Sequence, residues 1–118
     1  MSSRIITILA LVLVTISTSL RADVTVEDYK KFTKNRKSMD FAAVQNYVSG
    51  LGAGAMWSSK TFNEIYGVPL YCAPDESAAT AENYMAILDK TIRKYESGTK
   101  DIIGSILVIG LIETYPCK

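Results

Sequence analysis

The 118-residue sequence contains no histidine, two cysteines, three prolines and one tryptophan. Without an imidazole, a Cys–His thiol protease and a zinc site of mixed thiolate and imidazole ligands each lack a necessary group. Neither sign of charge is in excess, because 13 basic residues accompany 12 acidic ones. Nucleic acid and anionic membranes both require a clear basic surplus from their partners, so neither is expected here. We expect no metal site and no cofactor.

No apolar run near the N-terminus is long enough to cross a bilayer as a stable helix, which takes about 20 residues. The run from Ile5 to Ile16 follows a positive charge at Arg4 and precedes small or polar residues. This layout is typical of a cleavable secretory signal peptide covering residues 1–22. Ala22 is the natural last residue before the cut. Cleavage after Ser19, or retention of the segment as a membrane anchor, are the alternatives.

The mature chain, residues 23–118, is long enough for one domain and too short for two. Cleavage removes Arg4 and Arg21, which leaves 11 basic and 12 acidic residues. An exported chain of this kind is expected to oxidise its two cysteines, Cys72 and Cys117, to one structural disulfide. Closing a loop of about 46 residues stabilises the fold by about 4 kcal/mol at most.

Apolar spacing predicts an all-α fold, a compact bundle of about four helices stapled by that disulfide, with no compelling strand. The predicted helices are Val26 to Arg36, about Phe41 to Ile65 or Tyr66, Ala81 to Glu96, and Asp101 to Thr114. Thr25 is expected to cap the first helix, Gly67 to stop the second, and Ser77 or Thr80 to cap the third. Residues 70–75 are predicted to be extended, because Pro69 and Pro74 oppose helix before them.

The second predicted helix carries two neighbouring stripes. One contains Val44, Val48, Leu51 and Ala55, and the other contains Tyr47, Gly50, Gly54 and Trp57. Glycine inside a helix costs about 1 kcal/mol relative to alanine. We therefore predict that Gly50, Gly52 and Gly54 mark close helix packing and that Trp57 packs in the core, with a role as an interface anchor as the alternative for Trp57. The last helix is apolar on nearly every side, which predicts a central, buried helix with close neighbours at Gly104 and Gly110.

Several segments together resemble one known family. They are Tyr47-Val48-Ser49-Gly50-Leu51-Gly52, Trp57, Gly67-Val68-Pro69-Leu70-Tyr71-Cys72-Ala73-Pro74, Tyr84 through Ile92, and Leu111 to Cys117 ending in Tyr-Pro-Cys. This pattern, from about Phe41 to Lys118, resembles the Rap/Tai family of periplasmic immunity proteins of bacterial type VI secretion. The resemblance implies a helical fold with the Cys72–Cys117 bridge, often dimeric, and inhibition of a secreted cell-wall amidase from sister cells. Some relatives carry further cysteines near the first helices, which this chain lacks.

The favoured hypothesis is a periplasmic binding inhibitor without catalytic activity. A rigid surface loses little entropy on binding, which suits tight inhibition. The candidate contact elements are the loop Asp75-Glu76-Ser77, the loop Ser97-Gly98-Thr99-Lys100, Tyr66, and the basic face of the first helix with Lys30, Lys31, Lys34, Arg36 and Lys37. Each loop can also be read as ordinary solvated surface, and the basic run as a solvated helix face.

Two alternatives remain. A small periplasmic helical chaperone that opens in acid would be rich in carboxylates, whereas acids and bases nearly balance here. A hydrolase with a carboxylate pair would have to use Asp75 and Glu76, which are adjacent in a loop and poorly placed as a fixed acid–base couple.

Overall fold

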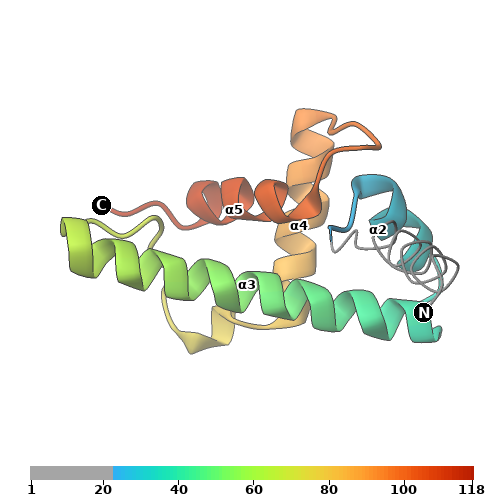
Figure 1. Cartoon of the computed structure of the whole chain (residues 1–118), viewed down its shortest axis with the longest axis horizontal. Helices are drawn as coiled ribbons and strands as arrows, with labels where there is room; N and C mark the ends of the chain where they lie inside the picture. Colours follow the sequence, from blue (N-terminus) through green and yellow to red (C-terminus); the bar gives the residue numbers. More distant parts are fainter. Residues whose placement is uncertain (1–22) are drawn as a thin grey trace, which may run out of the picture.

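The computed structural model describes residues 23–118, so the predicted signal peptide and both of its possible cleavage sites lie outside the described residues. This part of the chain is all-α, as predicted, and contains no strand beyond one isolated bridge between Thr25 and Ile102. Its elements are α2 (Val26–Phe32), α3 (Met39–Tyr66), the short 3-10 helix η1 (Glu76–Ala78), α4 (Ala81–Tyr95) and α5 (Ile103–Thr114) (Figure 1). No helix in the described range is both long and apolar enough to span a membrane.

The predicted helix ends are mostly confirmed. The Thr25 hydroxyl accepts a hydrogen bond from the Asp28 N–H, and the Thr80 hydroxyl accepts one from Asn83. Gly67 ends α3 with a φ of 75°, a left-handed conformation that glycine adopts without steric cost. Of the two candidate caps for α4, Thr80 is therefore the one used.

The first helix ends earlier than predicted, at Phe32 rather than Arg36. The Asn35 side chain accepts a hydrogen bond from the Lys37 N–H, and the Asn35 backbone carbonyl accepts one from the Ser38 N–H. These local bonds form a turn that competes with continued helix. As a result, the predicted basic helix face is divided between a short helix and this turn.

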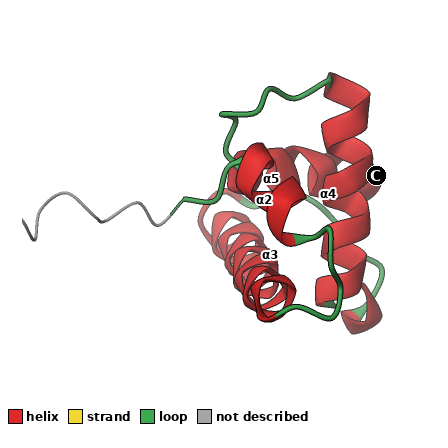
Figure 2. Ribbon diagram, turned by 90° about the vertical axis from the view of Figure 1, so that its right-hand side faces the viewer, coloured by secondary structure: helices red, strands yellow, loops and turns green. Residues whose placement is uncertain are grey.

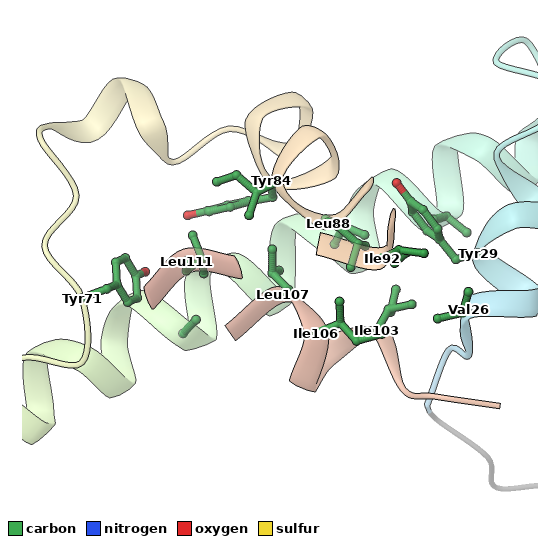
Figure 3. Close-up of a cluster of buried hydrophobic side chains, with 14 residues drawn as sticks. Val26, Tyr29, Tyr71, Tyr84, Leu88, Ile92, Ile103, Ile106, Leu107 and Leu111 are labelled. Atoms are coloured by element: carbon green, nitrogen blue, oxygen red, sulfur yellow. The ribbon is translucent and has the colours of Figure 1, made fainter. Parts of the chain in front are cut away.

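The long helix α3 forms the base of the molecule (Figure 1). The last helix, α5, runs roughly along α3, whereas α4 crosses both at a steep angle, an arrangement also visible in the turned view (Figure 2). The short α2 closes the end near the start of α3. Buried apolar residues from all four helices and from the segment after α3 form one core (Figure 3): Val26, Tyr29, Val44, Val48, Ala55, Tyr71, Tyr84, Ile87, Leu88, Ile92, Ile103, Ile106, Leu107 and Leu111.

The prediction that α5 is buried all round is wrong. Leu107 and Leu111 are fully buried, but Ile109 is 45% exposed and Ile112 is 41% exposed. Apolar composition identifies a helix that can be buried, whereas the number of neighbouring elements decides how many of its sides are covered. Here α3 and α4 leave one side of α5 open to solvent.

The glycine prediction holds for only one of the three glycines in α3. A Cβ on Gly52 would lie 2.0 Å from the Tyr84 ring, so the aromatic ring occupies the space that a side chain would take. Gly50 and Gly54 have nothing within 4 Å of the Cβ position, so the prediction of close packing is wrong there. In α5, Gly110 makes a close approach to Thr91, whereas Gly104 makes only an ordinary contact.

The predicted disulfide is present. Cys72 and Cys117 are joined with their Cα atoms 5.1 Å apart. The Cys72 N–H also donates to the Tyr115 carbonyl at 2.8 Å. The middle of the chain is thereby fastened to its C-terminal end.

Candidate binding cleft

The segment 69–79, between α3 and α4, is held against α3 by one serine. Ser59 lies on the buried stripe of α3, and the residue is 5% exposed. The hydroxyl oxygen accepts hydrogen bonds from the Leu70 N–H at 3.0 Å and the Tyr71 N–H at 3.3 Å, and the group donates to the Tyr71 carbonyl at 3.2 Å. A polar residue in an apolar stripe thus provides hydrogen-bond partners for the backbone groups of the segment 69–79.

The other side of the segment is fixed by α4 and the C-terminal tail. The Asn83 amide donates to the Ala78 carbonyl at 2.8 Å and to the Tyr115 hydroxyl at 2.9 Å. With the disulfide, these contacts anchor the segment to α3, to α4 and to the tail. The segment therefore has little freedom left to lose when a partner binds.

A cleft of about 370 Å³ opens between the C-terminal half of α3 and this segment. Its apolar lining comes chiefly from Met56, Pro69, Tyr71, Ala78, Tyr84, Leu111 and Tyr115. Its polar and charged lining comes from Ser59, Lys60, Asn63, Asp75 and Glu76. Burial raises the pKa of the Tyr71 and Tyr84 hydroxyls, so both stay neutral across the physiological range. The cleft combines an apolar interior with a few charges, as ligand and side-chain pockets do.

Asp75 stabilises the turn at the edge of the cleft. Its carboxylate accepts hydrogen bonds from the Ser77 hydroxyl and, at 2.8 Å, from the Ser77 N–H. These bonds hold the pKa of Asp75 below its ordinary value, so the group is an anion at neutral pH. Asp75 and Glu76 are both exposed and present negative charge beside Lys60.

The structure brings together only part of the predicted contact set. Asp75 and Glu76 line the cleft, and Ser77 is exposed next to them in η1. Tyr66 is 66% exposed but lines a separate shallow hollow at the end of α3. Lys100 lies in the loop between α4 and α5, at the opposite end of α4 from η1 (Figure 1).

Sequence reasoning missed Lys60 and Asn63, which face the cleft from α3. Ser59, a serine in the apolar stripe of α3, was the available signal for this contact. A buried hydroxyl needs a hydrogen-bond partner, and the nearest backbone without helical hydrogen bonds was the proline-flanked segment after α3. The core assignment of Trp57 is also wrong. Its side chain is 63% exposed, and the Lys60 ammonium lies 5.0 Å from its ring centroid.

The basic residues of the first helix contribute to a different hollow. Lys30, Lys34 and Arg93 line a space of about 580 Å³ around a bond from the Tyr29 hydroxyl to Asp89, 2.8 Å long. Burial, with the bond to Asp89, raises the pKa of Tyr29, so the hydroxyl remains a donor. This bond ties α2 to α4 and gives Tyr29 a structural role.

Comparisons with protein-family models, with curated proteins and with solved structures find no match for this chain. Among residues 23–118, no three or more cysteine or acidic side chains gather closely enough to hold a metal ion. The lining of the cleft beside the disulfide suits the binding of an apolar side chain with a charged neighbour.

Proposed function

We propose that this protein is a periplasmic immunity protein that binds and inhibits a secreted effector of the cell-wall amidase class. The single observation that carries the proposal is the charged, apolar-lined cleft built by a segment anchored through a disulfide. The resemblance of the sequence around this segment to the Rap/Tai family supplies the effector class. The disulfide is consistent with an exported protein.

The geometry favours contact with a protein partner. The segment 69–79 is already fixed by Ser59, Asn83 and the disulfide, so association orders little that was free. An apolar side chain of the partner can enter the cleft, where burial is favourable by roughly 25 cal/mol per Å². The exposed anions Asp75 and Glu76 favour a partner with basic residues around its active site, because complementary charges raise the association rate.

The test is inhibition of a defined enzyme. The disulfide-bonded protein is titrated into a purified type VI peptidoglycan amidase effector, and release of soluble peptides from cell-wall sacculi is measured. We expect activity to disappear at an equimolar ratio. No inhibition by excess protein would overturn the proposed amidase class.

Charge-reversing substitutions test whether the effector binds at the cleft. Glu76→Lys and Lys60→Glu each change a residue that lines the cleft, and neither native side chain takes part in a hydrogen bond or ion pair in the described part of the chain. A loss of about 1.4 kcal/mol in binding raises the inhibition constant about tenfold. Lys100→Glu is the matched control at the other end of α4 and should leave inhibition unchanged. Equal effects at all three positions would contradict binding at the cleft.

A periplasmic chaperone is the second candidate, and the exposed apolar side chains at the end of α3 favour it. Lowered pKa values at Asp75 and Glu113 mean that acid removes some stability, but both groups are exposed and stabilise only a surface turn and a surface ion pair, which gives acid-driven opening little support. Protection of an aggregating client at low pH, with no inhibition of the amidase, would favour the chaperone over the inhibitor.

A further inference from the structure

A groove of about 580 Å³ lies between α2 and the C-terminal half of α4. Its floor contains Tyr29 and Ile92, which are 2% and 5% exposed and lie side by side at one end of the core (Figure 3). The cleft beside the disulfide is lined by residues near the opposite end of α4. The α2–α4 groove is therefore separate from that cleft.

Hydrogen bonds fix the two helices that form the walls of this groove. The Tyr29 hydroxyl donates to Asp89 Oδ1 at 2.8 Å, which ties α2 to α4. The Val26 N–H donates to the Asp101 carbonyl at 2.9 Å, which ties the start of α2 to the loop after α4. A ligand that enters the groove thus orders little backbone, and its binding loses little entropy from the protein.

The groove presents charges of both signs that do not pair with each other. Its charged lining consists of three cations and two carboxylates: Lys30, Lys34, Arg93, Asp89 and Glu96. None of the five forms an ion pair within residues 23–118, where the one ion pair joins Lys94 to Glu113. Both signs of charge are therefore available to a ligand, with one cation in excess.

Glu96 is an unusual residue for the end of a helix. Its backbone is left-handed, with φ 48° and ψ 44°, and no other non-glycine residue in the range 23–118 has a positive φ. This conformation is unfavourable for a residue with a Cβ, and glycine usually adopts it at a helix end. A negative charge is also unfavourable beside the last carbonyls of a helix. Local structure does not explain this glutamate, whereas a ligand contact in the groove does.

We propose that the α2–α4 groove binds a short peptide that carries both carboxylate and ammonium groups, and that this ligand is a stem peptide of the bacterial cell wall. Lys30, Lys34 and Arg93 bind its carboxylates, and Asp89 and Glu96 bind its ammonium groups. A free stem peptide contains a diamino acid and more carboxylates than ammonium groups, which matches the excess of cations in the lining. The charge pattern supports the zwitterionic class, and the cell wall as the source rests on the proposed function.

The lining favours a peptide of this kind over a polyanion. The two carboxylates repel a phosphate chain or an anionic bilayer, and a flat bilayer surface does not enter a groove. The Arg93 guanidinium can hold a carboxylate through two parallel hydrogen bonds, whereas the lysines act as point charges. The volume of the groove also falls in the range of small-ligand sites.

The test titrates the disulfide-bonded protein with the diaminopimelate-containing stem tripeptide and measures the heat of binding. We expect saturable binding, with changes in amide chemical shift confined to α2 and the C-terminal half of α4. The same tripeptide with acetylated amines is the matched ligand and should bind about tenfold more weakly, because it lacks the ammonium groups. No binding of the tripeptide, or equal binding of the acetylated form, would overturn the proposal, and the second result would indicate a site for acidic partners.

Two neutralising substitutions locate the bound carboxylates. Arg93→Gln should weaken tripeptide binding about tenfold, because the guanidinium loses its charge-assisted hydrogen bonds. Lys31→Gln removes the same charge from an exposed position of α2 that does not line the groove, and affinity should change less than about twofold. Equal effects of the two variants would contradict binding in the groove.

Glu96→Gly gives a readout that a purely structural role does not. Glycine adopts the left-handed conformation without steric cost, so the melting temperature should rise. Tripeptide binding should nevertheless weaken about tenfold, because one carboxylate is lost. Unchanged affinity in this variant would contradict the assignment of Glu96 to the ligand.

Failure of this inference can be distinguished from failure of the proposed inhibition. Arg93→Gln should still inhibit the amidase effector, because the cleft does not contain Arg93. A protein that inhibits the effector but does not bind the tripeptide would contradict the groove proposal alone. One that binds the tripeptide but does not inhibit would contradict the proposed function alone.

Discussion

The two parts of α3 differ sharply in what covers them. From Val44 to Ser59 the inward stripe is buried beneath α4 and α5. Over the last two turns, Phe62 and Tyr66 continue that stripe but remain exposed. Stability accounts for the first part, because its side chains form the core. It does not account for the second, because exposed side chains contribute little to the free energy of unfolding.

The largest expected effect on stability distinguishes the hydrophobic core from the exposed C-terminal end of α3. Leu107→Ala removes a fully buried side chain and should lower the free energy of unfolding by about 2–5 kcal/mol. Ile65→Ala, at a residue 66% exposed, should change it by less than about 0.5 kcal/mol in the monomer. Urea denaturation followed by circular dichroism measures both. Comparable losses would mean that the end of α3 is part of the folding core.

The disulfide comes next. Cys72→Ser combined with Cys117→Ser should destabilise the protein by about 2–4 kcal/mol, because the reduced chain recovers loop entropy when it unfolds. Thermal melts with and without reductant test the wild type in the same way. An unchanged melting temperature would remove the structural role assigned to this bond.

The glycines of α3 should respond in opposite directions. Gly52→Ala drives a methyl group into the buried Tyr84 ring and should cost about 1–3 kcal/mol. Gly54→Ala meets open space and should raise monomer stability by up to about 1 kcal/mol. Measurements at low protein concentration keep self-association out of the comparison. Destabilisation by both would imply that Gly54 is covered within one chain.

Ser59→Ala should cost about 1–3 kcal/mol, because the Tyr71 N–H loses its hydroxyl partner beneath the segment 69–79. Hydrogen exchange should quicken at Leu70 and Tyr71. Ser58→Ala, at an exposed neighbouring position, is the control. Unchanged exchange at these two amides would show that other contacts fix the segment.

The smallest effect concerns the surface pair of α4 and α5. Hydrogen bonds from Tyr95 and Lys94 hold the pKa of Glu113 below its ordinary value. The stabilisation is therefore present above the unfolded-state pKa and is lost as pH falls through the lowered pKa. Glu113→Gln should therefore be slightly less stable than the wild type at neutral pH, and the difference should shrink as pH falls through the lowered pKa. A difference that grows as pH falls would contradict the assignment.

Much of the fold could be predicted because its signals are local. The threonine caps at Thr25 and Thr80 and the left-handed stop at Gly67 depend on neighbouring residues alone. The cysteine pair could be inferred because an oxidised chain with two thiols has one possible bond.

The prediction errors arose where the packing of other helices decided whether a residue is buried. The stripe of Val44 and the stripe of Trp57 have similar spacing, and only the placement of α4 and α5 determines that the first is buried. The same reason explains the exposed side of α5. In the candidate cleft, Asp75 and Glu76 were found from the loop sequence, whereas Lys60 and Asn63 depended on how that loop lies against α3.

The N-terminal segment of the described chain is hydrogen-bonded to residues far along the sequence. The Val26 N–H donates to Asp101, Glu27 to Thr99, and Ile103 back to Val24. Because these partners lie at residues 99–103, the hydrogen bonds of the N-terminal segment can close only after the chain has been synthesised that far. The beginning of the described chain therefore completes its folding against one of the last parts to be made.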